Sequence, residues 1–317
     1  MKTLITAALL AASPLLCAPA LAEDVTTTSA PQAASLFEGK RITVLVEGPE
    51  DGQDIVLIPG LASPRAVWGP TAERLKGKYR LHIVQIRGFG DEAGMNGEEG
   101  PVLDAFITEL GDYIDDQIDN KRRPAPAVIG HSMGGLSALM LGAYIPGKIG
   151  KIMVVDAVPF IGTIFGSPNV DAIRPQAEAM AVGMRATYGK PTGQAPVLTD
   201  EQKEAAARSN RMSINADGQA QVARWSADAD PRVVAQLMYD VMTTDMRPKL
   251  PNIVAPVTLL YAHDPAIMTE AQATGAFVPQ YAGAARFNAV RIEGSRHFIM
   301  LDQSQKFADE VDAFLAR

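Results

Sequence analysis

The sequence predicts an α/β protein with a mostly parallel, doubly wound sheet and a helical insertion. Three observations support this fold class. Short runs of Val, Ile and Leu alternate along the chain with longer amphipathic segments. Several of the runs lack polar alternation, as expected of strands that are covered on both faces. Late in the chain, a long interval without strand-like runs indicates helices inserted between two strands.

The apolar runs and the segments between them define the predicted core. The amphipathic segments are long enough to be helices that connect parallel strands, so residues 41–158 and 250–317 are expected to form one α/β core. The predicted strands cover residues 41–48, 54–60, 79–88, 125–132, 150–157, 256–264 and 287–294. The predicted helices cover residues 65–77, 102–121, 133–146, 266–282 and 302–316.

The interval from 159 to 249 is too long for a simple connection, and we predict that it forms a helical lid over one edge of the sheet. Helical patterns occur at 170–188, 199–212, 218–227 and 231–244. Methionines recur through this interval, and most of them are expected to pack its helices against the body of the protein. A minority could line an apolar, adaptable pocket. These methionines are Met180, Met184, Met212, Met238, Met242 and Met246.

The first 22 residues predict a signal peptide. A positive start at Lys2 precedes a short apolar run, and the small residues "ALA" at 20–22 fit cleavage after Ala22. Ser13-Pro14 interrupts the apolar run, which argues against a stable membrane anchor. We therefore expect export to the periplasm or the medium, with residues 23–40 as a flexible tether. The mature chain would have no thiol, because the single cysteine, Cys17, lies in the signal.

Composition and charge exclude some partners. The 317 residues carry a formal net charge of −7, which makes a nucleic-acid surface a poor hypothesis. The densest basic cluster, Lys121-Arg122-Arg123, is expected at a solvated helix end. No metal-ligand spacing and no glycine-rich phosphate motif is recognisable, so neither a metal nor a cofactor is predicted. A small molecule is the expected partner, and the sequence does not indicate the oligomeric state.

The stretch "VIGHSMGGLSAL" at 128–139 carries the strongest functional signal. Gly130-His131-Ser132-Met133-Gly134 fits the pattern G-x-S-x-G, with a buried strand predicted before it and a helix after it. Such a turn strains the serine backbone, and the flanking glycines leave room for the strand and helix to approach. The hydroxyl would lie at the carboxyl edge of the sheet, where open α/β folds bind ligands. Ser132 is therefore the predicted nucleophile.

A serine hydroxyl needs a base within hydrogen-bond reach, and the chain has four histidines. His82 lies inside a predicted strand, His131 is part of the turn itself, and His263 ends a strand. His297 follows the last predicted strand in "EGSRHFIM", where a loop can return to the carboxyl edge of the sheet. His297 is the predicted base.

These residues resemble the α/β-hydrolase fold, in particular serine esterases and lipases exported by bacteria and carrying a helical lid. The resemblance runs from about residue 41 to residue 317, and "GHSMGG" is its most specific element. It implies the order nucleophile, acid, histidine, which Ser132, Asp264 and His297 reproduce. "IPGLASPRAVW" resembles the family's oxyanion loop, although Pro59 replaces a usual histidine. The resemblance thus implies oxyanion donors at the backbone N–H groups of Leu61 and Met133.

Two aspartates compete as the carboxylate that orients His297. Asp264 ends the strand after the insertion, and the resemblance favours it because the family has mostly used this later position. Asp156 in "MVVDAVP" ends the strand directly after the nucleophile and remains the alternative. Either residue could instead cap a following turn or helix.

The implied activity is hydrolysis of a carboxylic ester through an acyl-enzyme intermediate. The apolar side chains expected in the lid, including Leu237 and Trp225, favour uncharged esters. Two alternatives remain open, because this fold also hosts other functions. One is a binding or receptor-like protein that keeps the three residues but scarcely turns over, and the other is a related activity such as lactonase or acyltransferase.

Overall fold

The computed structural model describes residues 34–118, 124–186 and 212–317. The predicted signal peptide with Cys17 and Ala22, most of the predicted tether, and the basic cluster at 121–123 lie outside the described residues. So does the predicted helix at 199–212, except for its last residue. No helix in the described ranges is both long and apolar enough to span a bilayer.

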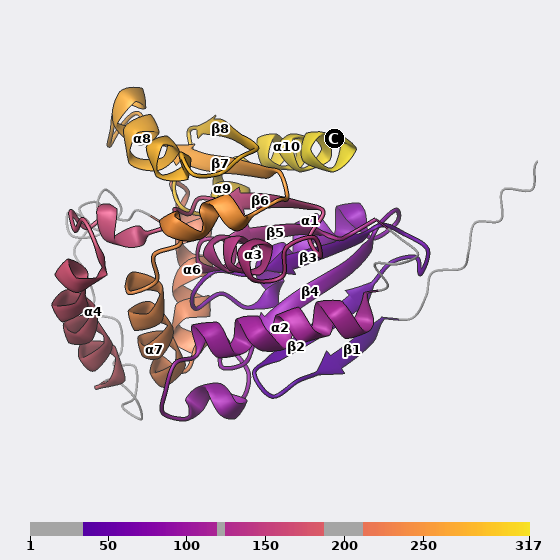
Figure 1. The fold of residues 1–317 in the computed structure, drawn as a ribbon, viewed down its shortest axis with the longest axis horizontal. Helices are drawn as coiled ribbons and strands as arrows, with labels where there is room; N and C mark the ends of the chain where they lie inside the picture. Colours follow the sequence, from indigo (N-terminus) through magenta and orange to yellow (C-terminus); the bar gives the residue numbers. More distant parts are fainter. Residues whose placement is uncertain (1–33, 119–123, 187–211) are drawn as a thin grey trace, which may run out of the picture. The chain divides into compact units, whose positions relative to one another are not determined.

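The described residues form an eight-stranded sheet in the order β1-β2-β4-β3-β5-β6-β7-β8 (Figure 1). β2 pairs in antiparallel fashion with both of its neighbours, and the strands from β4 to β8 are parallel. The predicted fold class is thereby confirmed. The strands are β1 (Ser35–Glu38), β2 (Ile42–Glu47), β3 (Asp54–Ile58), β4 (Arg80–Ile86), β5 (Ala127–His131), β6 (Lys151–Val155), β7 (Val257–His263) and β8 (Phe287–Glu293).

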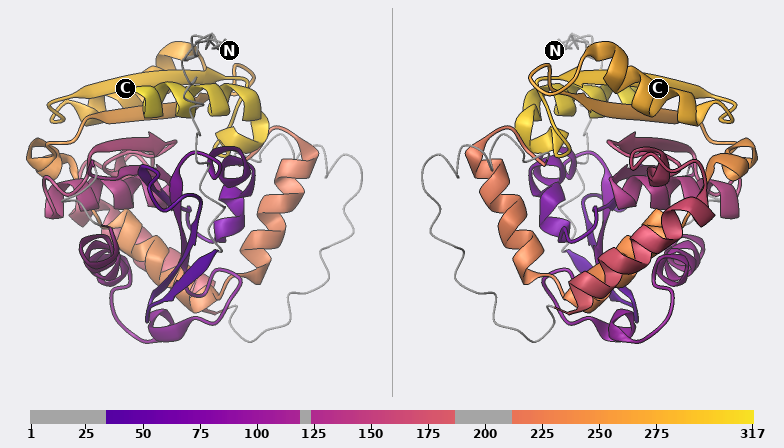
Figure 2. Two further views of the ribbon diagram at one scale, coloured as in Figure 1. Left: turned by 90° about the vertical axis from the view of Figure 1, so that its right-hand side faces the viewer. Right: turned by 90° about the vertical axis from the view of Figure 1, so that its left-hand side faces the viewer.

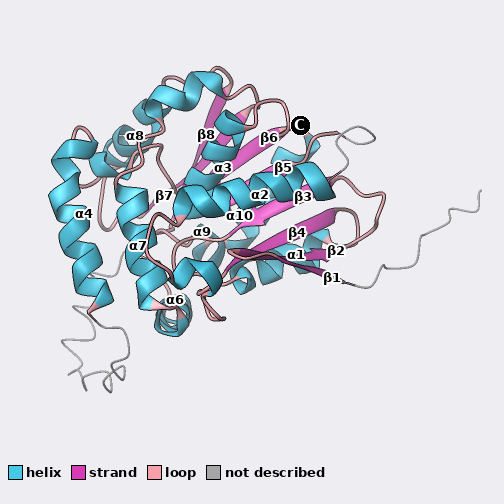
Figure 3. Ribbon diagram, turned by 60° about the horizontal axis from the view of Figure 1, so that its bottom comes forward, coloured by secondary structure: helices cyan, strands magenta, loops and turns pink. Residues whose placement is uncertain are grey.

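Helices cover both faces of the sheet (Figure 3). Apolar residues of α2, α3 and α8 pack on one face, and those of α1, α9 and α10 pack on the other. Each central strand is therefore buried on both sides, which explains its continuous apolar sequence. The helices are α1 (Gly69–Leu75), α2 (Leu103–Gln117), α3 (Met133–Tyr144), α8 (Glu270–Phe277), α9 (Ile299–Asp302) and α10 (Ser304–Ala316).

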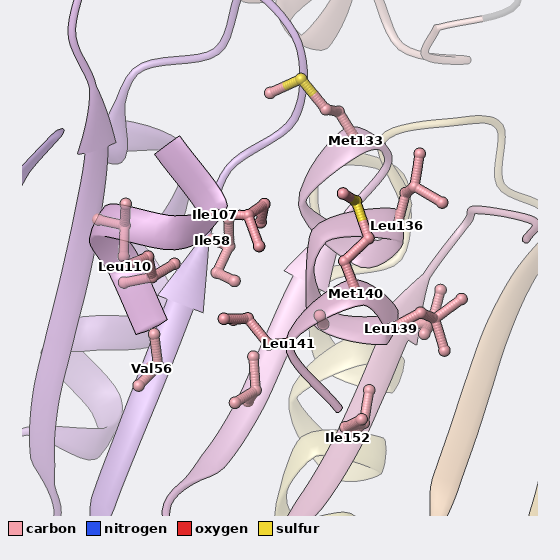
Figure 4. Packing of buried hydrophobic residues seen from close by; sticks show 14 of the residues in the cluster. Val56, Ile58, Ile107, Leu110, Met133, Leu136, Leu139, Met140, Leu141 and Ile152 are labelled. Carbon is pink, nitrogen blue, oxygen red and sulfur yellow. The ribbon is translucent and has the colours of Figure 1, made fainter. Parts of the chain in front are cut away.

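Helix α3 is the most deeply buried helix of the core. Its residues from Met133 to Ala143 are all buried, so this part of the helix has no solvent-exposed face. Figure 4 shows Leu136, Met140 and Leu141 of α3 packed among side chains of the sheet and of α2. Burying a side chain of this size contributes roughly 1.5–3 kcal/mol of transfer free energy. This packing fixes the first turn of α3, where Ser132 precedes the helix.

Each of the seven predicted strands matches one of the strands β2 to β8, within a few residues at either end. Strand β1 was not predicted, because its four residues fall in the stretch 23–40 that was interpreted as a flexible tether. β1 is mostly exposed and pairs with β2 at the sheet margin. A short, exposed edge strand carries little apolar periodicity, so the sequence gives no strand signal there.

Three α-helices lie between β6 and β7 in the described part of the interval 159–249. They are α4 (Val170–Arg185), α6 (Ala216–Asp228) and α7 (Pro231–Met242). α4 packs beside α7, as the right-hand view of Figure 2 shows. Phe160, Ile173 and Met242 form the centre of a small apolar cluster, against which Met180 and Met238 pack. These methionines therefore join helices of the insertion to one another, whereas Met246 packs in the main core cluster, which is the role expected for most of the six.

Helix α7 ties the insertion to the core. Its Leu237 is fully buried in the cluster that also contains α2 and α3. The carboxylate of Asp240 accepts hydrogen bonds from the backbone N–H groups of Val102 and Leu103, at 2.7 and 3.0 Å. A carboxylate at this position satisfies free N–H groups and matches the helix dipole. A side chain of the insertion thus caps α2 of the core.

Candidate active site

Ser132 lies in a sharp turn between β5 and α3, with φ of 55° and ψ of −122°. This backbone conformation is strained for a residue with a side chain. Two glycines allow the turn to close: a Cβ at Gly130 would lie 2.0 Å from the carbonyl oxygen of Gly134. A Cβ at Gly134 would lie 2.2 Å from the carbonyl oxygen of Ile58. The predicted strand-turn-helix context of Ser132 is therefore present.

Ser132, His297 and Asp156 form a hydrogen-bonded chain. The Nε2 atom of His297 is 2.9 Å from Ser132 Oγ, and its Nδ1 atom is 2.7 Å from Asp156 Oδ2. Because the carboxylate accepts, Nδ1 carries the proton in the neutral ring, and Nε2 is left to accept from the hydroxyl. The imidazole is about one quarter exposed and the carboxylate is buried. This arrangement can deprotonate a hydroxyl and stabilise the resulting imidazolium.

The prediction that Asp264 orients His297 is wrong. The Asp264 carboxylate instead accepts from the guanidinium Nε of Arg296 at 2.8 Å and from the backbone N–H of Ala266 at 2.9 Å. The ion pair with Arg296 is largely buried. Asp264 therefore holds the residue that precedes His297 and does not contact the ring.

Asp156 reaches His297 because β6 lies directly beside β5 and because the chain turns sharply at Asp156, the residue after β6. The residue has φ of 49°, which redirects the chain immediately after the strand. Its backbone N–H donates to Leu260 at 2.7 Å, and its Oδ1 atom accepts from the backbone N–H of Ala262 at 2.8 Å. Two contacts with β7 thus fix the carboxylate. The sequence identified Asp156 as the alternative but gave no sign of the positive φ that makes it the partner.

His131, the neighbour of Ser132, supports the loop that carries His297. Its Nε2 atom lies 3.0 Å from the backbone carbonyl oxygen of His297, so Nε2 carries the proton and donates. The ring is fully buried against the rings of His297 and Phe298, with centroids 4.8 and 4.6 Å away. Burial, assisted by the nearby His297, holds the pKa of His131 well below its ordinary value. His131 is therefore a neutral support for the loop.

The remaining two histidines have structural partners. His82 is buried between Tyr113 and Asp54, with ring nitrogens 2.7 and 2.9 Å from their oxygens. His263 lies with Nε2 3.2 Å from the carbonyl oxygen of Met268. Within the described residues, no group of three or more His, Cys, Asp or Glu side chains is arranged to hold a metal ion.

The two predicted oxyanion donors flank the turn at Ser132. Met133 is the first residue of α3, so its N–H has no acceptor within the helix. Leu61 lies in the loop after β3, where Gly60 approaches the serine so closely that a Cβ there would lie 3.1 Å from Ser132 Cβ. The loop then turns sharply at Ala62, with φ of 55°. The loop after β3 and the start of α3 therefore meet beside the hydroxyl.

The neutral state of His131 predicts a contribution to the pH dependence of stability. Its pKa is lowered in the folded state, so the unfolded chain binds the proton first, and stability is lost as pH falls below the ordinary value of about 6.5. Lowering the pH from about 7.5 to about 5.5 should therefore reduce the free energy of unfolding. Urea unfolding of the wild type and of His131→Phe at both pH values should show a smaller decrease in the variant. Equal decreases would contradict the prediction.

Comparison with known proteins places the chain in a family. Residues 55–310 match the model of the family described as "Alpha/beta hydrolase family". The chain is 25% identical over 279 residues to 3-oxoadipate enol-lactonase 1 of Acinetobacter baylyi, a match that spans 88% of this chain and 94% of that protein. It is 27% identical over 123 residues to the pimeloyl-[acyl-carrier protein] methyl ester esterase of Nitrosospira multiformis, which covers 38% of this chain and 44% of the esterase.

Solved structures share the fold. An enol-lactonase from Burkholderia xenovorans superimposes with a TM-score of 0.59 at 21% identity, over 87% of this chain and 96% of that one. A thermophilic esterase from Thermogutta terrifontis superimposes with a TM-score of 0.67 at 15% identity, over 90% of this chain and 98% of that one. These relatives have the same fold, and proteins named as lactonases and esterases recur among them. The chain belongs to the alpha/beta hydrolase family.

Proposed function

We propose that the protein is a serine hydrolase that cleaves carboxylic esters through an acyl-enzyme intermediate. The hydrogen-bonded chain from Ser132 through His297 to Asp156 is the observation that carries this proposal. It joins a nucleophile, a base and an orienting carboxylate at the carboxyl edge of the sheet, with an α-helix beginning directly after the serine. The names of the relatives as esterases and lactonases support it.

The geometry assigns each residue a step. His297 Nε2 takes the proton of the Ser132 hydroxyl while Oγ bonds to the ester carbonyl carbon, and Asp156 stabilises the imidazolium. The backbone N–H groups of Met133 and Leu61 would hold the oxyanion. Each such donor typically lowers the activation barrier by about 3–4 kcal/mol. The tetrahedral intermediate collapses as His297 returns the proton to the departing alcohol. Water then attacks the acyl carbon while His297 takes its proton, and the imidazolium passes this proton to Ser132 Oγ as the carboxylic acid leaves.

We propose uncharged, apolar esters as the substrate class. Aromatic side chains lie next to His297: Phe298 contacts its ring, and Trp225 of α6 packs on Phe298, with centroids 5.6 and 6.1 Å apart. The guanidinium of Arg296 is already bound by Asp264 and is a poor anchor for a substrate carboxylate. We also propose that the insertion between β6 and β7 acts as a lid, and that the protein acts after export, which residues 1–22 suggest.

Lactones are a second candidate substrate class. The match to the Acinetobacter baylyi enol-lactonase spans nearly all of both proteins, whereas the match to the methyl ester esterase spans less than half of either. A lactone is an internal ester, so the steps assigned to Ser132 and His297 apply without change. The difference is that the leaving alcohol stays attached to the acyl group.

Replacing the nucleophile tests the proposed activity. The mature protein should hydrolyse p-nitrophenyl acetate and butyrate, and Ser132→Ala should lower kcat by more than about 1000-fold because the acyl-enzyme can no longer form. Ser137→Ala is the matched control: Ser137 lies on α3, which begins directly after Ser132, but its hydroxyl donates to the carbonyl of Met133 within the helix. Substantial turnover by Ser132→Ala would exclude the proposed nucleophile. A wild type that binds esters without turnover would favour a binding protein.

Two aspartate variants separate the carboxylate roles. Asp156→Asn should lower kcat by about 10⁴-fold, because the amide favours the wrong imidazole tautomer. Asp264→Asn breaks the buried pair with Arg296, so it should lower the free energy of unfolding by about 3 kcal/mol and keep kcat within about tenfold. Steady-state kinetics and urea unfolding of both variants measure the contrast. The assignment fails if Asp264→Asn loses more kcat than Asp156→Asn.

A substrate panel tests the proposed substrate class. Neutral esters should show a higher kcat/KM than esters of the same length that bear a carboxylate near the scissile bond, by about tenfold or more, since burying an unpaired charge is costly. Adding γ- and δ-lactones to the panel compares the two candidate classes. A higher kcat/KM for the charged esters would contradict the proposal, and a preference for lactones would select the second candidate.

A further inference from the structure

A short segment of the insertion, residues 212–215, lies against the loop that carries His297. The backbone N–H of Phe298 donates to the carbonyl oxygen of Met212 at 2.8 Å. The side chain of Asn215 donates to the carbonyl oxygen of Leu301 at 3.0 Å. Asn215 also caps α6 by accepting from the N–H of Gly218. The segment therefore connects the start of α6 to the backbone on the C-terminal side of His297.

The carboxylate of Asp302 joins this segment to the other side of His297. Its Oδ1 atom accepts from Ser213 Oγ at 2.6 Å, from the backbone N–H of Ile214 at 2.9 Å and from Asn215 Nδ2 at 3.2 Å. Its Oδ2 atom accepts from the backbone N–H of Arg296 at 2.9 Å. Ser213 is fully buried. One side chain thus binds the insertion with one oxygen and the histidine loop with the other.

One backbone group of each of the three successive residues 296–298 is therefore held by a different part of the chain. Asp302 binds the N–H of Arg296, His131 binds the carbonyl of His297, and Met212 binds the N–H of Phe298. Two of these three contacts depend on segment 212–215 or on the carboxylate that it donates to. The insertion therefore helps to set the position of the His297 backbone.

We propose that Asp302 is a positioning residue, through which segment 212–215 of the insertion controls the placement of His297 toward Ser132. The inference rests on the proposed function and deepens it. Proton transfer needs the imidazole within hydrogen-bond reach of the hydroxyl, and a displacement of about 1 Å can cost about 100-fold in rate. The carboxylate is suited to this role because both of its oxygens accept hydrogen bonds. The amide of an asparagine at this position has one oxygen and one NH₂ group, so one of the two sides would face a donor and lose its acceptor.

The test compares Asp302→Asn with a matched control on the next helix, Asp309→Asn. Asp309 is exposed on α10, and its carboxylate accepts from the side-chain amide of Gln305 at 2.8 Å. Asp302→Asn should lower kcat for a p-nitrophenyl ester by about tenfold or more. KM should change by less than about twofold, because both oxygens of Asp302 are bound by groups of the protein itself. An unchanged kcat in a folded Asp302→Asn protein would overturn the proposal.

A double-mutant cycle tests the link to the insertion. Ser213→Ala removes one donor to Asp302 and should lower kcat by about threefold. The double variant Ser213→Ala, Asp302→Asn should be no slower than Asp302→Asn alone, because both changes act on the same connection. If the two losses multiply instead, Asp302 acts independently of the insertion and the proposal is wrong.

Amide hydrogen exchange separates this inference from the proposed function, since it requires no substrate. Asp302→Asn should speed exchange at the Arg296 and Phe298 amides by about fivefold or more, and Asp309→Asn should leave it unchanged. If the wild type proves inactive on every ester and lactone, faster exchange still supports the placement of the loop while the proposed function fails. If the wild type is active and exchange stays unchanged, the positioning role fails alone.

Discussion

The close approach of α3 to the ends of β3 and β5 is the constraint on which the site depends. Gly130 and Gly134 let these backbones come within distances that no side chain permits. The approach forces Ser132 into its positive φ and brings the loop containing Leu61 beside the start of α3. The buried packing of α3 supplies the stabilisation that holds this strain. A core helix and a reactive turn are thus one structural unit.

The strain is shared along one edge of the sheet. In the described ranges, the non-glycine residues with positive φ are Ala62, Ser132 and Asp156. They follow β3, β5 and β6, which are neighbours in the sheet. Each turns the chain sharply after a parallel strand. Together the three turns bring the loop containing Leu61, the Ser132 hydroxyl and the Asp156 carboxylate to the same edge of the sheet. Strained residues that gather at one edge in this way are typical of sites where geometry is held fixed for chemistry.

Much of this arrangement could be predicted from the sequence, because the strands and the turn at Ser132 have local signals. Apolar runs marked β2 to β8, and the glycines around Ser132 marked the turn. His297 followed from its place after the last strand. The choice between Asp156 and Asp264 could not be made in this way, since both end strands. It depends on the backbone turn at Asp156 and on the pairing of Asp264 with Arg296, which are tertiary features.

The contacts made by segment 212–215 left no readable pattern either. Met212, Ser213 and Asn215 are ordinary residues for a loop before a helix, and their partners lie more than 80 residues further along the chain. Long-range contacts of this kind depend on how the insertion packs against the core. They have no periodicity or spacing that a single sequence displays.

The capping of α2 by Asp240 bears on how this insertion can diverge or be engineered. α7 completes a core helix and fills the main apolar cluster, so an exchange of the whole interval between β6 and β7 would leave α2 uncapped and a cavity beneath it. α4 packs on α7 and carries exposed apolar surface at Val182. Grafts from other hydrolases should therefore replace α4 and keep segment 212–215, α6 and α7 with the host core. The insertion is modular only in its outer layer.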